Sequence, residues 1–324
     1  VDEFLVNGGA DYNTVSSNQY YSSVAALKDG GFVVTWEDQG GYDGSSHGVF
    51  GQRFDVDGER AGAEFQINTK TDSNQQDPSI AALEDGGFVV TWESRYQDDL
   101  DNNNDAQNNY GVYGQRYDKD GKAHSDGEFL VNTYTDNDQT NPSVTGLGDG
   151  GFVVTWQSQY QDNTGSWGIY GQRYDKDGNT AGSEFQINTY TSGEQTDPDV
   201  TALLDGGFVV TWQDGRNSTD IYGQRYEKSG TAFGDEFQIN TYTSSHQYDS
   251  SVTALADGGF MVTWESDGQD GSNYGIYGQR FSVDGSTEPF FASAEAVNNS
   301  GGLDDAKVED VLLHGASSSM HQID

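Results

Sequence analysis

The sequence predicts an all-β protein, a five-bladed β-propeller built from four-stranded antiparallel blades. A motif of the form Gly-Gly-Phe-Val-Val-Thr-Trp occurs five times, with methionine for one valine in the last copy, and its tryptophans are Trp36, Trp92, Trp156, Trp212 and Trp264. Self-similarity at a spacing of about 50 to 65 residues indicates stacked supersecondary units. Helical periodicity is nearly absent, and 43 glycines accompany 19 tyrosines and 16 phenylalanines, which is typical of short strands and tight turns.

Each repeat contains four strand-like runs, which in the second repeat cover residues 79–83, 88–93, 111–117 and 128–133. An Asp-Gly pair separates the first two runs in every repeat, and it favours a hairpin because glycine accepts the positive φ of a primed turn. The run Phe-Val-Val-Thr-Trp does not alternate between apolar and polar residues. Both of its faces are therefore expected to be covered, as in a sheet stacked between two others.

Four antiparallel strands repeated five times predict a propeller that the N-terminal strand closes. Residues 3–7 have the sequence of a fourth strand, whereas the last repeat ends after its third run at Phe281. The N-terminal strand would then complete the last blade. An open β-solenoid is the alternative, and it is less favoured because open stacks need dissimilar end caps. The propeller is predicted to span residues 1–285, with residues 286–324 as a non-repeat tail or linker.

A repeated arginine in the third run needs a partner, because a charge inside an apolar sheet is costly when unpaired. The glutamate that opens the fourth run is also repeated. The sequence therefore predicts one Arg–carboxylate pair in each blade, with this glutamate as the candidate partner. The residues concerned are Arg53, Arg116, Arg173, Arg225 and Arg280, and Glu3, Glu64, Glu128, Glu184 and Glu236.

The composition excludes several classes of partner. The 53 acidic side chains outnumber the 15 basic ones and give a formal net charge of −38, which argues against binding to nucleic acid and to an anionic membrane surface. No apolar run is long enough for a membrane helix, so no membrane insertion is expected. Cysteine is absent, which removes disulfides and thiolate metal sites. No signal peptide is visible, and the chain begins at Val1, so we expect a mature or excised piece.

The loops that join the second and third runs differ most between repeats, and functional residues are expected there. One position in these loops is acidic: Asp43, Asp98, Asp162 and Asp270. Calcium takes six to eight oxygen ligands, so these aspartates are the predicted Ca²⁺ ligands. The alternative interpretation is that aspartate and glycine simply form the turns.

An aromatic side chain or histidine precedes the third run in four repeats, and two more tyrosines lie nearby. Aromatic rings stack on the C–H faces of sugars, so these residues are the predicted carbohydrate-binding set. The alternative is that each ring caps the apolar edge of its own blade. The residues are His47, Tyr110, Trp167 and Tyr274, with Tyr96 and Tyr160.

A glutamine in every inter-blade loop is interpreted as a scaffold hydrogen-bonding residue near the axis, and the alternative is that these residues form the floor of a central site; the five are Gln19, Gln75, Gln139, Gln195 and Gln247. Enzymatic motifs are weak. The match to G-x-S-x-G at residues 44–48 lies in a strand–strand loop, whereas a nucleophile elbow requires a strand–turn–helix context.

The repeat also resembles a known family. Phe-Gln-Ile-Asn-Thr-Tyr-Thr, then Pro-x-Val-x-x-Leu-x-Asp-Gly-Gly-Phe-Val-Val-Thr-Trp and Ile-Tyr-Gly-Gln-Arg-Tyr, is similar to a repeat of large secreted bacterial proteins of the RTX, hemolysin-type calcium-binding class, over residues 3–285. The resemblance implies an extracellular bacterial protein in calcium-rich surroundings and implies little about activity. The Gly-Gly-x-Gly-x-Asp nonapeptide of that class is absent.

The predicted function is a secreted, calcium-associated and non-catalytic binding module that recognises carbohydrate or a cell or matrix surface through its variable loops. One alternative is a polysaccharide-degrading enzyme, a glycosidase or lyase, with acidic residues on the same face. That alternative predicts an axial pocket that holds two carboxylates. The other alternative is a structural or adhesive spacer in a large surface protein.

Overall fold

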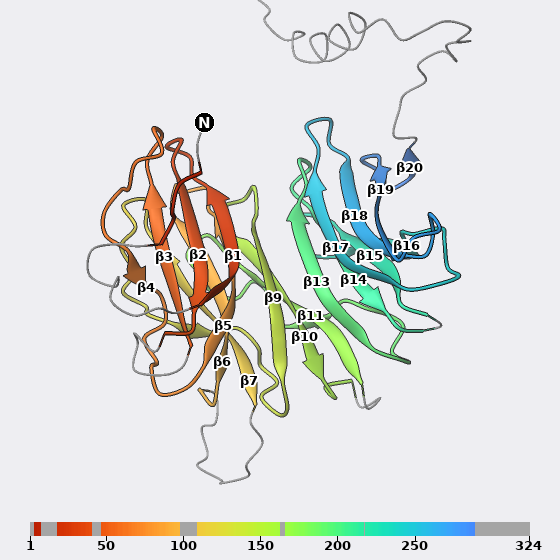
Figure 1. Ribbon diagram of the computed structural model, residues 1–324, viewed down its shortest axis with the longest axis horizontal. Helices are drawn as coiled ribbons and strands as arrows, with labels where there is room; N and C mark the ends of the chain where they lie inside the picture. Colours follow the sequence, from red (N-terminus) through yellow and green to blue (C-terminus); the bar gives the residue numbers. More distant parts are fainter. Residues whose placement is uncertain are drawn as a thin grey trace, which may run out of the picture. The chain divides into compact units, whose positions relative to one another are not determined.

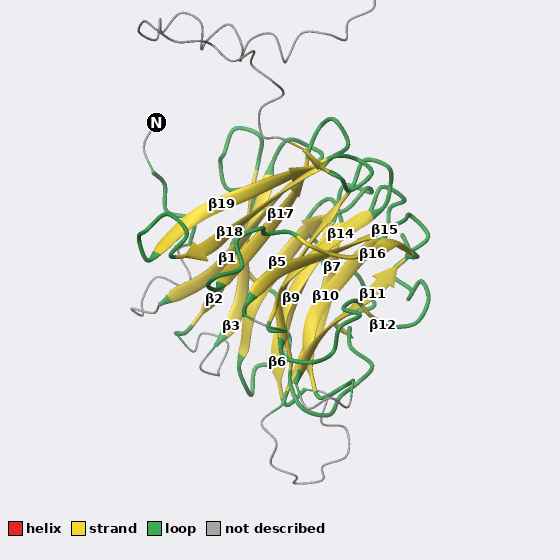
Figure 2. Ribbon diagram, turned by 90° about the vertical axis from the view of Figure 1, so that its right-hand side faces the viewer, coloured by secondary structure: helices red, strands yellow, loops and turns green. Residues whose placement is uncertain are grey.

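The computed structural model describes residues 3–7, 18–40, 47–97, 109–162, 166–216 and 218–288, which form only strands, turns and loops (Figures 1 and 2). Five four-stranded antiparallel sheets follow one another along the chain, which confirms the predicted fold class and blade number. The compact unit that contains them is Val1–Glu288. The part of the chain that the structure describes contains no helix that could span a membrane.

The blades have the same internal order, with the first strand innermost and the fourth at the outer edge. Blade 1 is β1 (Gln19–Ala26), β2 (Phe32–Asp38), β3 (Gly48–Phe54) and β4 (Phe65–Gln66); blade 2 is β5 (Gln75–Ala82), β6 (Phe88–Arg95), β7 (Tyr110–Tyr117) and β8 (Phe129–Leu130). Blade 3 is β9 (Gln139–Gly146), β10 (Phe152–Gln159), β11 (Trp167–Tyr174) and β12 (Phe185–Gln186); blade 4 is β13 (Gln195–Ala202), β14 (Phe208–Asp214), β15 (Asp220–Tyr226) and β16 (Ala232–Gln238). Blade 5 is β17 (Gln247–Ala254), β18 (Phe260–Asp267), β19 (Tyr274–Phe281) and β20 (Thr287–Glu288).

The two glycines of the first hairpin in blade 2, Gly86 and Gly87, are needed for different physical reasons. Gly86 adopts a φ of 89°, a conformation that costs glycine little. A Cβ atom on Gly87 would lie 2.2 Å from the carbonyl oxygen of Tyr117 on the third strand, so only glycine fits. The Asp85 carboxylate accepts the Gly87 amide at 2.9 Å and fixes the turn.

Each inner blade buries two faces, and the core of the protein lies between blades. We call the face toward the next blade the forward face and the other the backward face. In blade 2 the forward face carries Ala81, Leu83, Val89, Val112 and Val131, and the backward face carries Ile80, Phe88, Val90, Trp92, Tyr113 and Tyr117. Four such cores join the five blades in sequence. This two-sided burial is the reason that the second strand is apolar throughout.

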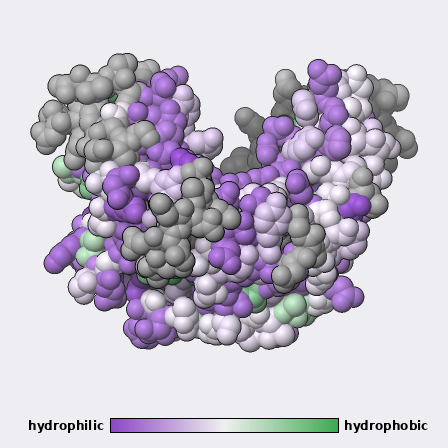
Figure 3. Space-filling model, turned by 90° about the horizontal axis from the view of Figure 1, so that it is seen from below, coloured by the Kyte–Doolittle hydropathy of each residue, from purple (hydrophilic) through white to green (hydrophobic). Residues whose placement is uncertain are grey.

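The N-terminal segment does not complete blade 5, so that part of the prediction is wrong. Residues 3–7 form no strand, and β19 pairs instead with β20. Phe4 packs edge-on against Phe54 of blade 1, with ring centroids 5.4 Å apart, and Arg60 Nη2 donates to the Leu5 carbonyl at 3.0 Å. These contacts hold the segment against blade 1. Figure 1 shows blade 1 in red and blade 5 in blue at the two ends of the array, and Figure 3 shows a notch between two arms of the molecule.

The predicted Arg–carboxylate pair is present in all five blades, but its carboxylate is the aspartate of the first hairpin and not the fourth-run glutamate. Arg53 Nη2 lies 2.5 Å from Asp29 Oδ2 in the first hairpin, and the same pair recurs as Arg116–Asp85, Arg173–Asp149, Arg225–Asp205 and Arg280–Asp257. The register explains the choice, because Val33 lies opposite Arg53 and places it beside the hairpin. The fourth-run glutamate instead binds the preceding blade: Glu184 Oε2 accepts from the Thr133 amide at 2.6 Å.

Candidate functional site

A pocket of about 450 Å³ lies where the innermost strands of all five blades meet. The same three positions of each first strand line it: residues 21–23, 77–79, 141–143, 197–199 and 249–251. These positions lie near the start of the first strand, beside the end of the second strand. The pocket therefore lies toward the end of the blades that carries the variable loops.

A β-bulge in each first strand points one side chain at the pocket. In β5 the register shifts between Gln76 and Ser79, and Asp77 has a φ of 55°. The equivalent residues also have positive φ values, between 50° and 54°: Tyr21, Asn141, Asp197 and Asp249. Such values are uncommon outside glycine, although asparagine and aspartate tolerate them best. The bulge belongs to the repeated scaffold, whereas its side chain varies: three blades carry aspartate, one asparagine and one tyrosine.

The residue after the repeated tryptophan supports the bulge of the next blade. Glu93 Oε1 accepts from the Asn141 amide at 2.7 Å, and Gln157 Oε1 accepts from the Asp197 amide at 2.9 Å. Burial raises the pKa of Glu93 to about 8, and the neighbouring Asp77 charge adds to that shift. Because the neutral Gln157 makes the same contact, we assign both residues to the scaffold.

The pocket itself is acidic. Asp197 accepts from the side-chain amides of Asn141 and Gln213, the latter at 2.5 Å. Asp199 accepts from the Ser143 hydroxyl at 3.0 Å. Burial raises the pKa of Asp77 to about 6, and the negative charges of Glu37 and Asp197 contribute. Burial likewise raises the pKa of Asp197 and Asp199. The lining residues include no lysine, arginine or histidine.

The predicted sugar-binding aromatics do not line this pocket. Trp167, Tyr110 and Tyr274 are the first residues of β11, β7 and β19. The Arg95 guanidinium lies 5.7 Å from the centroid of the Tyr110 ring and 4.8 Å from that of Tyr96, so these two rings share one cation. The structure thus brings together one pair of the six predicted residues.

The other members of the set stay on their own blades. His47 Nδ1 lies 2.7 Å from Glu37 Oε1. Tyr274 is 60% exposed, and its ring centroid lies 6.4 Å from that of Tyr248. Tyr160 is partly exposed at the edge of blade 3. These contacts agree with the interpretation of rings at blade edges and leave Tyr274 and Tyr160 accessible to a ligand.

The predicted calcium ligands fall partly outside the described residues, where Asp43 and Asp98 lie. Asp270 Oδ1 accepts from the Ser272 amide at 2.9 Å and from its hydroxyl at 2.6 Å, which is a turn-forming contact. Asp162 Oδ2 accepts from Gln186 Nε2 at 3.5 Å. Among the residues whose placement is described, no group of three or more His, Asp or Glu could hold a metal ion. Calcium binding stays a prediction.

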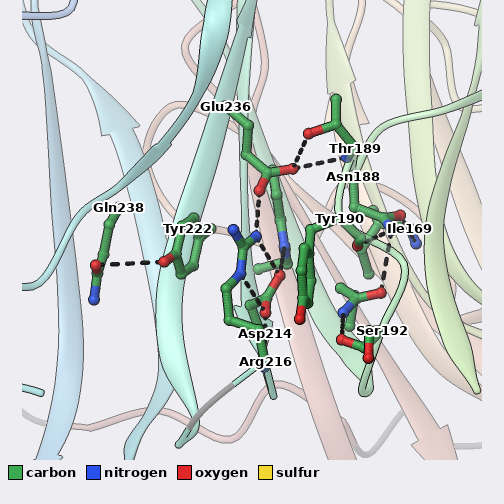
Figure 4. A network of polar contacts seen from close by, with 12 residues as sticks. Ile169, Asn188, Thr189, Tyr190, Ser192, Asp214, Arg216, Tyr222, Glu236 and Gln238 are labelled. Carbon is green, nitrogen blue, oxygen red and sulfur yellow. Dashed lines mark hydrogen bonds and ion pairs between the residues drawn. The ribbon is translucent and has the colours of Figure 1, made fainter.

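Blade 4 has the shortest loop between its second and third strands, and a partly buried arginine, Arg216, lies in this loop (Figure 4). The Arg216 guanidinium lies between the rings of Tyr190 and Tyr222, 4.4 and 3.7 Å from their centroids. Its Nη2 contacts Asp214 at 2.7 Å and also Glu236. Because Asp214 is fully buried, this arginine is a structural counter-ion rather than a group available to a ligand.

Four of the five predicted scaffold glutamines are buried, whereas Gln19 of blade 1 is exposed; the axial bulge residues were not found from the sequence. Gln75, Gln139, Gln195 and Gln247 are fully buried, and Asn68 Nδ2 donates to Gln75 Oε1 at 3.1 Å. The signal for the bulge lies two positions later in each repeat. There the side chain varies between repeated neighbours, and three of the five variable positions precede a proline: Pro78, Pro142 and Pro198.

Comparison with known proteins supports the fold alone. No family model and no curated protein sequence matches the chain. A protein of unknown function from Dyadobacter fermentans superposes with a TM-score of 0.61 at 13% identity, over 83% of this chain and 80% of that one. A leech intramolecular trans-sialidase has a TM-score of 0.58 at 9% identity, and NanB sialidase from Streptococcus pneumoniae 0.57 at 10%, each over 88% of this chain and 62% of its own. The chain therefore has a β-propeller fold, and it spans less than two thirds of these sialidases.

Proposed function

We propose that the protein is a secreted bacterial binding module for neutral carbohydrate, which it holds at the axial pocket and the adjoining loops. The observation that carries the proposal is the convergence of five bulge side chains on one pocket. The same backbone bulge recurs in every blade and carries tyrosine, asparagine or aspartate, so a symmetric scaffold can form an asymmetric site. Extracellular location is supported by the resemblance to the RTX class.

The chemistry of the lining favours a polyhydroxylated ligand without negative charge. The carboxylates of Asp77 and Asp197 can accept hydrogen bonds from sugar hydroxyls, and Asn141 offers a neighbouring amide. Tyr21 is largely exposed and presents a ring for stacking. An acidic sugar would meet carboxylates with no cation among the lining residues, in a chain of formal net charge −38.

A glycan array followed by calorimetry tests the proposal. Neutral glycans are expected to bind, and uronic or sialic acid glycans are not. Asp197→Asn should weaken binding at least about tenfold, since it removes a charged acceptor worth roughly 1.5 kcal/mol or more. The matched control is Asp175→Asn in the exposed hairpin after β11, which should bind like the wild type. The proposal fails if no neutral glycan binds, or if the two substitutions have equal effects.

The loop aromatics belong to the same test. If they form the rim of the site, Trp167→Ala and Tyr274→Ala should weaken binding. Tyr96 is a less suitable position for this test, because its truncation also removes the ring that lies under Arg95. An unchanged affinity in both variants would restrict the site to the pocket.

Calcium is proposed to order the loops that contain Asp43, Asp98, Asp162 and Asp270. A ligand that binds only the folded state stabilises it by mass action, so thermal melting should shift upward in millimolar calcium and downward with a chelator. The same melting temperature under both conditions would remove calcium from the proposal.

Hydrolysis is the second candidate, and it is favoured by the two carboxyl groups of Asp77 and Asp197 that line one pocket, with the pKa of Asp77 raised to about 6 by burial. A carboxyl group that titrates near pH 6 can act as a general acid while its neighbour is ionised. Release of reducing ends from a bound neutral polysaccharide, abolished in Asp77→Asn with binding retained, would support this activity. Binding without any release of reducing ends would leave a lectin-like module.

A further inference from the structure

The two end blades each leave uncovered the face that the inner blades bury. Ile276 on the forward face of blade 5 is 73% exposed, whereas its counterparts Ile169 and Ile221 are fully buried. Val24 on the backward face of blade 1 is 63% exposed, whereas its counterpart Val144 is 6% exposed. Two surfaces that pack against each other four times within the chain are thus present once more without a partner.

Within the described residues, the outer strand of blade 5 pairs with a different part of the third strand than in blade 1. In blade 1 the fourth strand pairs with the middle of the third, through Phe50 with Gln66 and Gly51 with Phe65. In blade 5, β20 pairs with the last two residues of β19, Arg280 and Phe281, the position that in blade 1 holds the isolated Phe54–Arg60 bridge. The backbone of Tyr277 and Gly278 therefore has no described strand at its outer edge.

An outer-strand sequence lies at the other end of the chain, at residues 3–7. Phe4 lies 5.4 Å from Phe54, and this contact reproduces the one that a fourth-strand phenylalanine makes with the next blade. The inner blades show it at 5.5, 5.3 and 5.5 Å: Phe65 with Tyr117, Phe129 with Tyr174 and Phe185 with Tyr226. Residues 3–7 thus occupy the place of the outer strand of a blade that precedes blade 1.

A pocket of about 430 Å³ separates that segment from the innermost strands of blade 1, and it is lined by Phe4, Leu5, Tyr20, Val34 and Trp36 among others. In the first inter-blade core, Val33 and Val49 of blade 1 pack in the cluster that contains Val90 and Trp92, the counterparts of Val34 and Trp36. The surface that fits this pocket is therefore a forward face. In blade 5 that face includes Met261 and Ile276, which correspond to Val33 and Val49 of blade 1.

We infer that two copies of this chain associate head to tail, with blade 5 of one copy docked on blade 1 of the next. Residues 3–7 of the second copy then pair beside Tyr277 and Gly278 of the first while Phe4 keeps its contact with Phe54. The partner is a second copy because both faces belong to the chain's own repeat: the forward face of blade 5 repeats the faces that pack on blades 2 to 5, and the backward face of blade 1 repeats the faces on which they pack. Among its described residues, each copy thus offers one uncovered forward face and one uncovered backward face.

This contact is heterologous, so it propagates from copy to copy. The net charge of −38 per copy opposes it, and salt screens that repulsion. The inference rests on the fold and does not require the proposed carbohydrate site, which the docked face adjoins because Tyr21 and Ser22 line both pockets.

Analytical ultracentrifugation over a range of protein concentration, at low and high salt, is the first test. The mean mass should rise with concentration and rise further in salt. Ile276→Asp should return the protein to a monomer without loss of thermal stability, since its side chain is already largely in solvent. The control is Leu204→Asp, another exposed apolar residue, which lies in the hairpin between β13 and β14 and should leave association unchanged. A monomer at all concentrations would overturn the inference.

Engineered cysteines identify the partner strand, because the native chain has no cysteine. Leu5 corresponds to Gln66 and Tyr277 to Phe50, which are paired residues in blade 1. Mixed Leu5→Cys and Tyr277→Cys proteins should form a disulfide heterodimer on mild oxidation, and the double variant should form a ladder of multimers. An intramolecular cross-link in the double variant would show that one copy closes its own ring and would overturn the inference, as would the absence of any cross-link.

Discussion

A matched pair of isoleucines tests the asymmetry between the inner and end blades. Ile169 lies opposite Gln157 in blade 3, and Ile276 lies opposite Glu265 in blade 5, so both occupy the same register position on a forward face. Ile169 is completely buried, whereas Ile276 is 73% exposed. The same substitution at the two positions therefore measures the inter-blade packing and holds the chemistry of the change constant.

The expected cost follows from the atoms removed. Alanine lacks three of the side-chain carbons of isoleucine, and at about 0.8 kcal/mol for each buried carbon the lost transfer free energy is roughly 2.5 kcal/mol. The cavity left between Val153 and the next blade adds to this, so Ile169→Ala should lower the free energy of unfolding by about 2 to 5 kcal/mol. Ile276→Ala should change it by less than about 0.5 kcal/mol, as surface substitutions do.

Urea denaturation at protein concentrations low enough to keep the copies apart provides the assay. Tryptophan fluorescence suits it, because five of the six tryptophans lie in the repeated second-strand motif. Equal losses in the two variants would refute the reasoning, since they would show that the forward face of blade 5 is covered within a single copy. A loss confined to Ile169→Ala would support the open arrangement.

Three further outcomes are expected. Arg216→Ala should lower the free energy of unfolding by about 3 to 5 kcal/mol, measured by denaturation, because Asp214 would be left buried without its counter-ion; an effect within 0.5 kcal/mol, the range typical of surface sites, would contradict this role. Gly151→Ala should prevent or strongly impair folding, judged by soluble yield and circular dichroism, since its Cβ would lie 2.1 Å from the Tyr174 carbonyl oxygen; native-like folding would contradict it. The raised pKa of Asp77 favours the folded state at low pH, and that contribution is lost as the pH rises from about 4 through 6, so Asp77→Asn should raise the melting temperature at pH 7.5 and leave it unchanged at pH 3.5; the reverse order would contradict the sign.

Local sequence patterns determined the blades. The second glycine of each hairpin, such as Gly87, faces a backbone carbonyl, and the apolar second strand packs on both sides. The repeated sequence therefore specifies both the turns and the burial of the strands. These requirements act between residues close in sequence or in the same position of neighbouring repeats. For that reason the strand order, the number of blades and the buried glutamines could be predicted without coordinates.

Contacts that depend on how neighbouring strands are aligned could not be predicted in the same way. Two repeated carboxylates, the hairpin aspartate and the fourth-run glutamate, are candidate partners for the arginine of the third strand. The strand register places Arg53 beside Asp29 and so selects the aspartate. The axial aspartates were missed because their role depends on a bulge, which redirects Asp77 and Asp197 toward the axis, and a linear pattern does not show which strand residues five blades bring together.

The sequence by itself determined five similar blades and an outer-strand sequence at residues 3–7, since turn geometry and two-sided burial are written in each repeat. Only the tertiary structure decided that this segment lies on blade 1 through Phe4 and leaves blade 5 uncovered. The physical reason is that closure depends on the sum of the rotations at four inter-blade interfaces. Each rotation is set by side-chain packing, which a repeat pattern does not specify.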